Sequence, residues 1–353
     1  MPRLVWAPLL AKRKIIRAIL EDNPDYIVWH GTHLSAVYLP QLRSIGKPLI
    51  WDIDRDLNGL EIFRNISFRE MFYRHHRFLW QNMLTAFLPR HLIKTVANSE
   101  FVTRIIVPSE PLRSSLTTVG IDPSKIIVVP SAVDINDFRG DEEPSSLRPN
   151  STSHTEDFLI TYFGSPCTLR GVDTAIYSMQ KILAKRQDVK LKIFSRRNLA
   201  CSTTEDACLQ QEEKVLLELI KKLGLTEHVE VISGMVDRSV LTQCLISSSA
   251  IVLPFKLILS EPPLSILEAM SLGKILVTTR LGSLPEVIGD DRGILIEPGD
   301  YKALAQVILF IAAHRKESER IGKNAQNYVA RLPTWEQIAH QFNDLLNDIS
   351  LSK

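Results

Sequence analysis

The stretch IVLPFKLILSEPPLSILEAMSLGKILVTTRLGSLPEVIGDDRGILIEP, residues 251–298, decides the fold. A short apolar run at 251–254 predicts a buried strand. A helical pattern beginning at Ser265 and ending at Gly273 follows, and 275–278 predicts a second buried strand. A strand, a helix and a strand in so few residues form a βαβ unit with a right-handed crossover. Such units build parallel sheets, whose ligands bind beyond the carboxyl ends of the strands.

The start of this helix offers a site for an anion. Pro262 and Pro263 have no N–H group and keep the chain extended just before the helix. The amides of Leu264, Ser265 and Ile266 are then the unpaired donors of the first turn. Donors at the positive end of a helix bind phosphate well, so we expect a phosphate group here.

Two carboxylates border the same helix start. Glu261 precedes the prolines, and Glu268 lies about one turn into the helix. A carboxylate repels phosphate, so we interpret Glu268 as an acceptor of hydrogen bonds from hydroxyl groups, such as those of a ribose. The alternative is that both glutamates only stabilise the N-terminus of the helix electrostatically.

The segment SEPPLSILEAMSLGKILVTT, followed by GSLPEVI at 282–288, resembles the donor-site signature of the family-four retaining glycosyltransferases, which have the GT-B fold. In that family two glutamates separated by a short loop bind a nucleotide-sugar. The resemblance gives Glu268 the ribose and Glu261 the sugar with its phosphate. The family's usual spacing has seven intervening residues, whereas Glu261 and Glu268 have six, and strict register would place Ser260 at the first position.

The length of 353 residues favours two domains. Strands alternating with helices predict an α/β protein with doubly wound parallel sheets. Together with the resemblance, this predicts two Rossmann-like domains facing each other across a cleft. We expect an N-terminal acceptor-side domain at 1–138, a polar linker at 139–157, a C-terminal nucleotide-sugar-binding domain at 158–333, and a terminal helix at 334–353 that packs back on the first domain.

The first domain also resembles the family, through IIVPSEPLRSSLTTVGIDPSKIIVVPSAVDINDF at 105–138. Family members normally begin with a strand and a glycine-rich loop that meets the donor, and this chain lacks them at its front. We therefore expect either a reduced N-terminal domain or a fragment.

A strand-to-helix loop, GSPCTLRGVD at 164–173, is a second candidate for the donor site. Gly164 and Gly171 allow the backbone to approach a ligand, and Arg170 can pair with a diphosphate. The resembled family has an arginine after the first glycine and a lysine before the second. Ser165 stands in place of that arginine, and Arg170 keeps the charge of the lysine. The alternative is an ordinary βα turn with solvated arginines.

Two further positions follow the next predicted strands. Arg196 or Arg197, after the strand LKIF, is placed to compensate for the missing cation. Gly234, after VEVIS, matches the loop where the backbone of the family meets the nucleobase, and a glycine carries no information on which base is bound.

The ends of the first two predicted strands carry acids and histidines. Residues 52–54 and 54–56 spell DID and DRD, the triplet that other glycosyltransferases use to hold a divalent metal. The resembled fold neutralises the diphosphate with a helix and an arginine, so we expect neither a metal nor another cofactor. Asp54 or Asp56 is a candidate contact for the sugar or the acceptor. His33 is a candidate base for the acceptor, and its alternative role is in packing.

Composition limits the cellular setting. The chain has no run of about 18 uncharged apolar residues and no signal-peptide layout, and its four cysteines show no metal-ligand spacing, which favours the cytoplasm.

Positive charge is concentrated in the first part of the chain: residues 1–130 hold 17 Lys and Arg against 11 Asp and Glu, an excess of 17 − 11 = +6. The stretch 64–94 mixes cations with aromatic residues, as in helices that bind anionic membrane surfaces; an amphipathic core helix is the alternative. No nucleic-acid-binding motif accompanies the charge.

We therefore expect a glycosyltransferase that moves a sugar from a nucleotide-sugar to a glycan or lipid-linked acceptor with retention of configuration. We also expect it to be cytoplasmic, or peripheral on the inner face of the cell membrane. The alternative is a non-catalytic subunit of the same fold that binds a nucleotide-sugar or a partner protein. A third reading is another sugar-nucleotide enzyme of this architecture, such as an epimerase.

Overall fold

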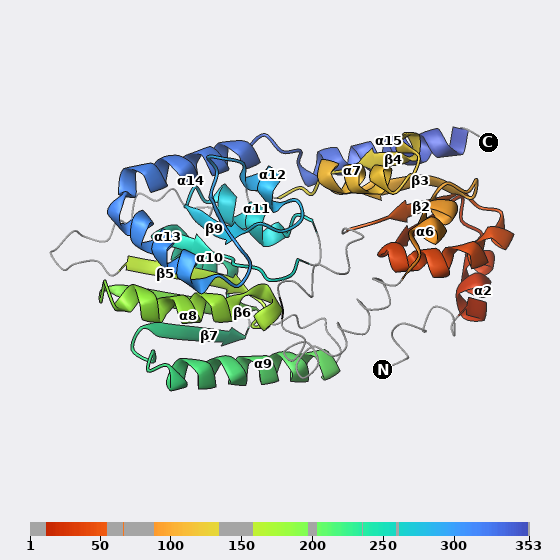
Figure 1. Ribbon diagram of the computed structural model, residues 1–353. Helices are drawn as coiled ribbons and strands as arrows, with labels where there is room; N and C mark the ends of the chain where they lie inside the picture. Colours follow the sequence, from red (N-terminus) through yellow and green to blue (C-terminus); the bar gives the residue numbers. More distant parts are fainter. Residues whose placement is uncertain are drawn as a thin grey trace. The chain divides into compact units, whose positions relative to one another are not determined.

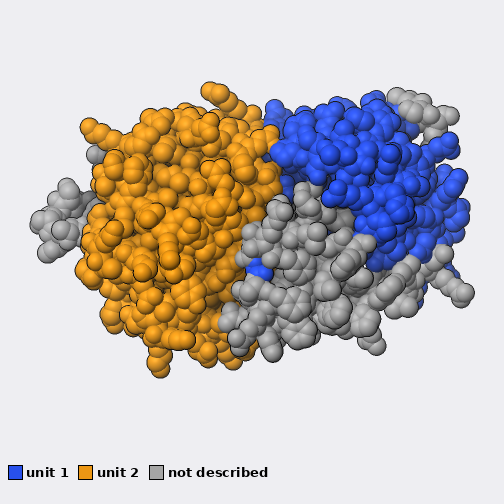
Figure 2. All heavy atoms as spheres, in the orientation of Figure 1, with its two compact units in different colours: residues 1–131, 259–261, 333–353 blue, residues 132–258, 262–332 orange. Residues whose placement is uncertain are grey.

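The computed structural model describes residues 12–54, 66, 88–133, 158–196, 203–234, 236–258 and 261–351 (Figure 1). The chain divides into two compact units (Figure 2). Unit 1 comprises residues 1–131, 259–261 and 333–353, and unit 2 comprises residues 132–258 and 262–332. Each unit holds its own parallel sheet, which confirms the predicted α/β class. The expected linker, 139–157, lies outside the described residues.

Unit 1 is built on a four-stranded parallel sheet in the order β1-β2-β3-β4. Its strands are β1 (Ile27–His30), β2 (Leu49–Asp52), β3 (Val102–Val107) and β4 (Ile126–Val128). The helices described around it are α2 (Lys12–Asp22), α6 (Arg90–Ala97), α7 (Glu110–Thr118) and α15 (Trp335–Leu351), with short 3₁₀ turns η1 (His33–Val37), η2 (Leu39–Ile45) and η3 (Pro123–Lys125).

The central strand β2 shows why this sheet needs cover on both faces. Its residues 49–51 are fully buried and alternate between two clusters. Trp51 belongs to a buried cluster against which Ile15 and Ile19 of α2 also pack. Ile50 points to the opposite face, where it packs with Ile349 of the last helix, α15. The sheet of unit 1 is therefore closed on one face by residues from the end of the chain.

Unit 2 holds a six-stranded parallel sheet in the order β10-β9-β8-β5-β6-β7. Its strands are β5 (Phe158–Gly164), β6 (Val189–Arg196), β7 (Val229–Gly234), β8 (Ala250–Val252), β9 (Leu276–Thr279) and β10 (Ile294–Ile296). If the strands β5 to β10 are numbered 1 to 6 in chain order, their order across the sheet, read from β7, is 3-2-1-4-5-6, the doubly wound arrangement. The strand order reverses between β5 and β8, and ligands of such sheets bind at the carboxyl ends of the strands at this switch point.

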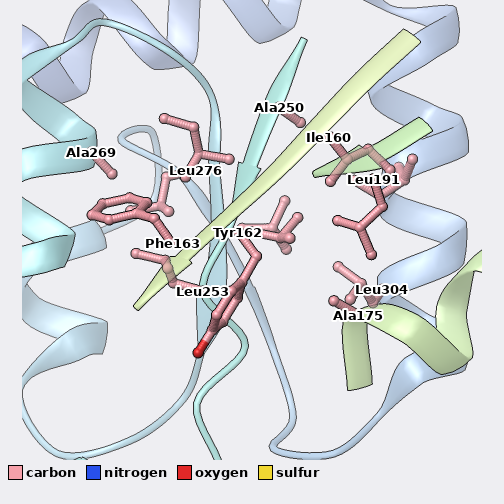
Figure 3. Close-up of a cluster of buried hydrophobic side chains, with 14 of the residues drawn as sticks. Ile160, Tyr162, Phe163, Ala175, Leu191, Ala250, Leu253, Ala269, Leu276 and Leu304 are labelled. Atoms are coloured by element: carbon pink, nitrogen blue, oxygen red, sulfur yellow. The ribbon is translucent and has the colours of Figure 1, made fainter. Parts of the chain in front are cut away.

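The helices of unit 2 are α8 (Val172–Leu183), α9 (Thr203–Lys222), α10 (Arg238–Ser247), α11 (Leu264–Ser271), α12 (Leu284–Ile288), α13 (Tyr301–Ala313) and α14 (Arg315–Val329), with the turn η5 (Thr168–Arg170). Side chains of β5 alternate between the two faces of the sheet (Figure 3): Phe163 lies on the side of Ala269, and Ile160 on the side of Leu191. Helix α8 packs against α13, and α11 packs against α14.

Helices α11 and α14 approach each other closely at a pair of glycines. A Cβ atom on Gly322 of α14 would lie 2.3 Å from the carbonyl oxygen of Gly273, which follows α11. Gly273 itself adopts φ +68°, the left-handed conformation that ends helices. The predicted end of the helix at Gly273 is therefore confirmed, and the absence of a side chain at Gly322 lets α14 pack against this turn.

Two local features differ from what the sequence predicts. The polar stretch 198–213, with its two cysteines, predicts an inserted loop, but the chain is helical from Thr203, because Leu216 and Ile220 bury one face of α9 four residues apart. The helical stretch 301–329 is two helices, since His314 leaves the helical conformation at φ −122° and ψ 55°. Neither proline nor glycine marks that break in the sequence.

Candidate functional site

The loops that follow β5 and β8 meet at the switch point of unit 2. The amides of Lys256 and Leu257 both donate to the carbonyl oxygen of Leu169, at 3.1 and 3.0 Å. Gly171 has φ +79°, and a Cβ atom there would lie 1.7 Å from the carbonyl oxygen of Pro254. The glycine at 171 is thus required by the packing of one loop on the other.

A buried ion pair joins the same two loops. The Lys256 ammonium lies 2.6 Å from the Asp173 carboxylate in the first turn of α8, and the residues are 8% and 9% exposed. The sequence does not reveal this pair, because 83 residues separate its members and no periodicity connects the two loops that contain them. A buried ion pair is costly to break from one side, since the remaining charge stays in the interior.

The remaining residues of the loop after β5 are held by local contacts. The Tyr162 hydroxyl donates to the carbonyl oxygen of Ser165 at 2.7 Å, and burial raises the pKa of Tyr162 so that it remains a neutral donor. The Ser165 hydroxyl accepts from the amide of Cys167 at 3.3 Å. The guanidinium of Arg170 is half-buried, 5.5 Å from the centre of the Phe255 ring. The Arg170 side chain therefore packs against Phe255 in the loop that follows β8.

Helix α11 begins at Leu264 with Pro263 as its N-cap, and no side chain caps it. The amide of Ile266 donates to the carbonyl oxygen of Pro263 at 2.9 Å, which corrects the expectation that it is unpaired. Among the described residues, the amides of Leu264 and Ser265 have no such acceptor. Leu264 is 44% exposed and Ser265 is half-buried, so the first turn of α11 lies at the surface of unit 2.

The two glutamates of the signature lie in different surroundings. Glu268 is half-buried on α11 within unit 2, and its carbonyl oxygen accepts from the hydroxyl of Ser271. Glu261 is 4% exposed and belongs to unit 1, where its amide donates to the carbonyl oxygen of Asp54 at 3.1 Å. Ser260, the other candidate for the first position, lies outside the described residues.

The ends of β6 and β7 are tied together by a buried carboxylate. Arg196 and Gly234 are register partners at the last positions of these strands. Gly234 has φ +96°, and the side chain of Arg196 lies outside the described part of the chain. Next to them, the hydroxyls of Ser195 and Ser233 both donate to the Glu213 carboxylate of α9, the first at 2.9 Å. This carboxylate was also missed, because the segment containing it was predicted to be a loop.

In unit 1 the first two strands end in a histidine and an aspartate. Nδ1 of His30 lies 2.7 Å from Oδ2 of Asp52, and Nε2 lies 3.7 Å from Oδ2 of Asp54. His33 begins η1, and its side chain, like all of Asp56, lies outside the described residues. Within the described ranges, no group of three or more His, Cys, Asp or Glu is placed to hold a metal ion.

The fold and the switch point define a protein built from parallel α/β units with donors arranged for an anionic ligand. The model of the Glycosyl transferases group 1 matches residues 145–328, and that of Glycosyltransferase Family 4 matches residues 1–137. The chain belongs to the group 1 glycosyl transferases and is a family-four glycosyltransferase.

Similar proteins agree with this placement. The MMP alpha-(1->4)-mannosyltransferase of Mycolicibacterium hassiacum is 25% identical over 330 residues, which cover 92% of this chain and 71% of the relative. Sucrose-phosphate synthase of Thermosynechococcus elongatus has a TM-score of 0.70 at 17% identity, covering 97% of this chain and 78% of that one. HepE of Anabaena in complex with UDP-glucose has a TM-score of 0.64 at 18% identity, covering 95% and 81%. The two structures show the GT-B fold.

We predict that Lys256→Met lowers the free energy of unfolding by about 3–5 kcal/mol, because the Asp173 carboxylate loses its buried cation. The double variant Lys256→Met/Asp173→Asn should recover part of this loss. Chemical denaturation measures both, with Lys302→Met as the control, since Lys302 is exposed on α13. If Lys256→Met and Lys302→Met lowered the free energy of unfolding equally, the ion pair between Lys256 and Asp173 would not contribute as predicted.

Proposed function

We propose that this glycosyltransferase uses a nucleoside-diphosphate sugar as donor and retains the configuration at the anomeric carbon. The observation that carries the donor assignment is the uncapped start of α11. Its first-turn amides, on Leu264 and Ser265, lie after β8 at the switch point of a doubly wound sheet. A helix N-terminus at this place binds phosphate. Retention is inferred from the family resemblance.

Each part of the donor has a proposed partner in the chain. The amides of Leu264 and Ser265 bind the diphosphate together with Arg170, while Glu268 accepts hydrogen bonds from the ribose hydroxyls. The backbone at Gly234 meets the nucleobase. Two further roles come from the resemblance alone: Glu261 lies beside the sugar, and Arg196 supplies a second cation.

Such a site accelerates transfer by positioning the donor and by stabilising charge on the leaving diphosphate. Peptide N–H groups and a guanidinium stabilise that charge without a metal, so we propose that none is required. The similar HepE structure is a complex with UDP-glucose, which supports a sugar nucleotide as donor. We propose a glycan or a lipid-linked sugar as acceptor.

We predict that Glu268→Gln weakens binding of the preferred nucleoside diphosphate, chosen by calorimetry among UDP, GDP and ADP. A hydrogen bond to a charged group contributes about 1.5–3 kcal/mol, so the affinity should fall roughly 10- to 100-fold. If the contact is to the ribose, the parent protein should lose a similar amount with the 2′,3′-dideoxy nucleotide, and the variant should lose little more.

The matched control is Glu227→Gln, an exposed glutamate in the same unit, which should bind like the parent. Unchanged melting temperatures would show that both variants are folded. Parental affinity in Glu268→Gln, or an unreduced penalty for the dideoxy nucleotide, would remove Glu268 from the ribose site.

A non-catalytic nucleotide-sugar-binding or partner-binding subunit is the second candidate. Ser165 favours it, because this serine replaces the family's arginine and uses its hydroxyl within its own loop. We predict that the protein releases a free nucleoside diphosphate from at least one of UDP-glucose, UDP-N-acetylglucosamine and GDP-mannose. Chromatography of the nucleotides measures this release. Tight binding of these donors with no release from any of them would favour the non-catalytic role.

We further propose that the enzyme is cytoplasmic and works at an anionic membrane surface, through the basic and aromatic stretch 64–94. Most of this stretch lies outside the described residues, so the proposal rests on its composition. Across the described part of the chain, no helix has both the length and the apolar character needed to span a membrane.

We predict that vesicles containing phosphatidylglycerol carry the parent protein upward in a flotation gradient, and that Arg74→Glu/Arg77→Glu stays at the bottom. The control is Lys221→Glu/Lys222→Glu, which makes the same charge change on the exposed end of α9. Equal flotation of the two double variants would refute a membrane role for this stretch.

A further inference from the structure

A buried carboxylate joins the ends of two neighbouring strands in unit 2. Ser195 of β6 and Ser233 of β7 are register partners, so their side chains lie on the same face of the sheet. The hydroxyl of Ser195 donates to Oε2 of Glu213 at 2.9 Å, and the hydroxyl of Ser233 donates to Oε1. Each oxygen of one carboxylate therefore holds the end of one strand.

A glutamate is a costly residue at this position. Glu213 is 7% exposed on α9, and Ser195 is 1% exposed. Hydrogen bonds from hydroxyl groups offset only part of the free energy that a carboxylate loses when it leaves water. An apolar side chain would pack against the same strands at a smaller cost, so stability alone does not account for Glu213. What an apolar side chain could not supply is the fixed geometry of the two hydrogen bonds.

Gly234 follows Ser233 directly and changes the direction of the chain. Its φ of +96° lies in the left-handed region, which ends the extended conformation of β7. Apart from its neighbours in the chain, no atom of the described residues lies within 4 Å of the position that a Cβ atom on Gly234 would occupy. Unlike Gly171, this glycine does not make room for another described part of the chain, and it leaves open space beside the backbone.

The open space lies at the edge of the sheet where ligands bind. Strands β6 and β7 are parallel, and Arg196 and Gly234 are their last register partners. Both strands therefore end at the carboxyl edge, which carries the ligand site in doubly wound sheets. A flat ring can approach a backbone that has no side chain closely enough to bond with its peptide groups. Under the proposed function, that ring is the nucleobase of the donor.

We propose that Glu213 is a positioning residue for the nucleobase. This inference rests on the proposed function. By holding Ser233, the carboxylate fixes the residue before Gly234 and so directs the peptide groups of Gly234 toward the base. By holding Ser195, it keeps the end of β6 in register with β7. Backbone groups contact the base, and one buried side chain sets their orientation.

A fixed backbone also selects among bases. Peptide N–H and C=O groups that cannot turn form hydrogen bonds only with a base whose donors and acceptors match them. A base that does not match leaves these groups unpaired and binds more weakly. Loss of the contact between Glu213 and Ser233 should therefore weaken both the binding of the preferred base and the preference for it.

The test separates the base from the rest of the nucleotide. A nucleoside monophosphate differs from ribose 5-phosphate by its base, so the ratio of their two affinities, here called the base factor, measures what the base contributes. NMR titration gives both affinities for the parent and for each variant. Ser233→Ala is the main variant, because Ser233 is exposed and its hydroxyl can be removed while Ser195 still donates to Glu213.

Ser233→Ala should lower the base factor roughly 3- to 10-fold, which corresponds to one ordinary hydrogen bond, and should leave the affinity for ribose 5-phosphate unchanged. Glu213→Ala should lower the base factor at least as much. Glu213→Gln keeps an amide oxygen as an acceptor for one hydroxyl, so it should restore part of the factor. The preference among UMP, GMP and AMP should weaken in parallel.

The matched controls are Ser247→Ala and Glu218→Gln, whose residues are exposed in the same unit. Ser247 donates only to the carbonyl oxygen of Cys244 in its own helix, and Glu218 lies on α9 with Glu213. Both controls should keep the base factor of the parent. Melting temperatures show which variants are folded, and Ser233→Ala and Glu213→Gln decide the question if Glu213→Ala does not fold.

The outcomes separate this inference from the function beneath it. A parental base factor in Ser233→Ala and Glu213→Gln would overturn the inference. Equal losses of affinity for ribose 5-phosphate and the monophosphate, or unfolding of Ser233→Ala, would assign the carboxylate to the stability of unit 2 and overturn it as well. Equal affinities of the parent for these two ligands would refute this inference alone, whereas a parent that binds no nucleoside diphosphate would refute the proposed function.

Discussion

The contact between Gly171 and the carbonyl oxygen of Pro254 is the constraint on which the donor side depends. No side chain fits at position 171, and the same two loops are joined by the amides of Lys256 and Leu257. Together with the ion pair from Lys256 to Asp173, these contacts fix the loop after β8 before it turns into α11. Under the proposed function, this packing orders part of the loop before a donor binds, which reduces the entropic cost of binding.

The fold was largely predictable because its strands are short, apolar and bounded by turn residues. The run FLITYFG, at the predicted start of the second domain, forms β5, and the helix over the EAM segment ends at Gly273 as expected. These features depend on local periodicity and on glycine, which sequence shows directly. The break at His314 was not predictable, since only the conformation of the folded chain reveals it.

The contacts of the candidate site were harder to predict from the sequence than the fold, because they depend on tertiary pairing. The pairs Lys256 with Asp173, and His30 with Asp52, join residues that are 83 and 22 positions apart, and no periodicity connects them. The triplet around Asp52 was noted for metal binding, whereas its first carboxylate accepts a hydrogen bond from a histidine. Tertiary pairing determines what such a side chain does, and a sequence alone shows only which groups are available.

Helix α15 has a consequence for how the protein is made. Its residue Ile349 covers Ile50 and Ile106 on one face of the sheet of unit 1, although the whole of unit 2 is synthesised between them. During translation, that apolar face of the sheet of unit 1 stays exposed until α15 has been synthesised. The sheet of unit 1 therefore completes its core only after unit 2 and α15 have been synthesised.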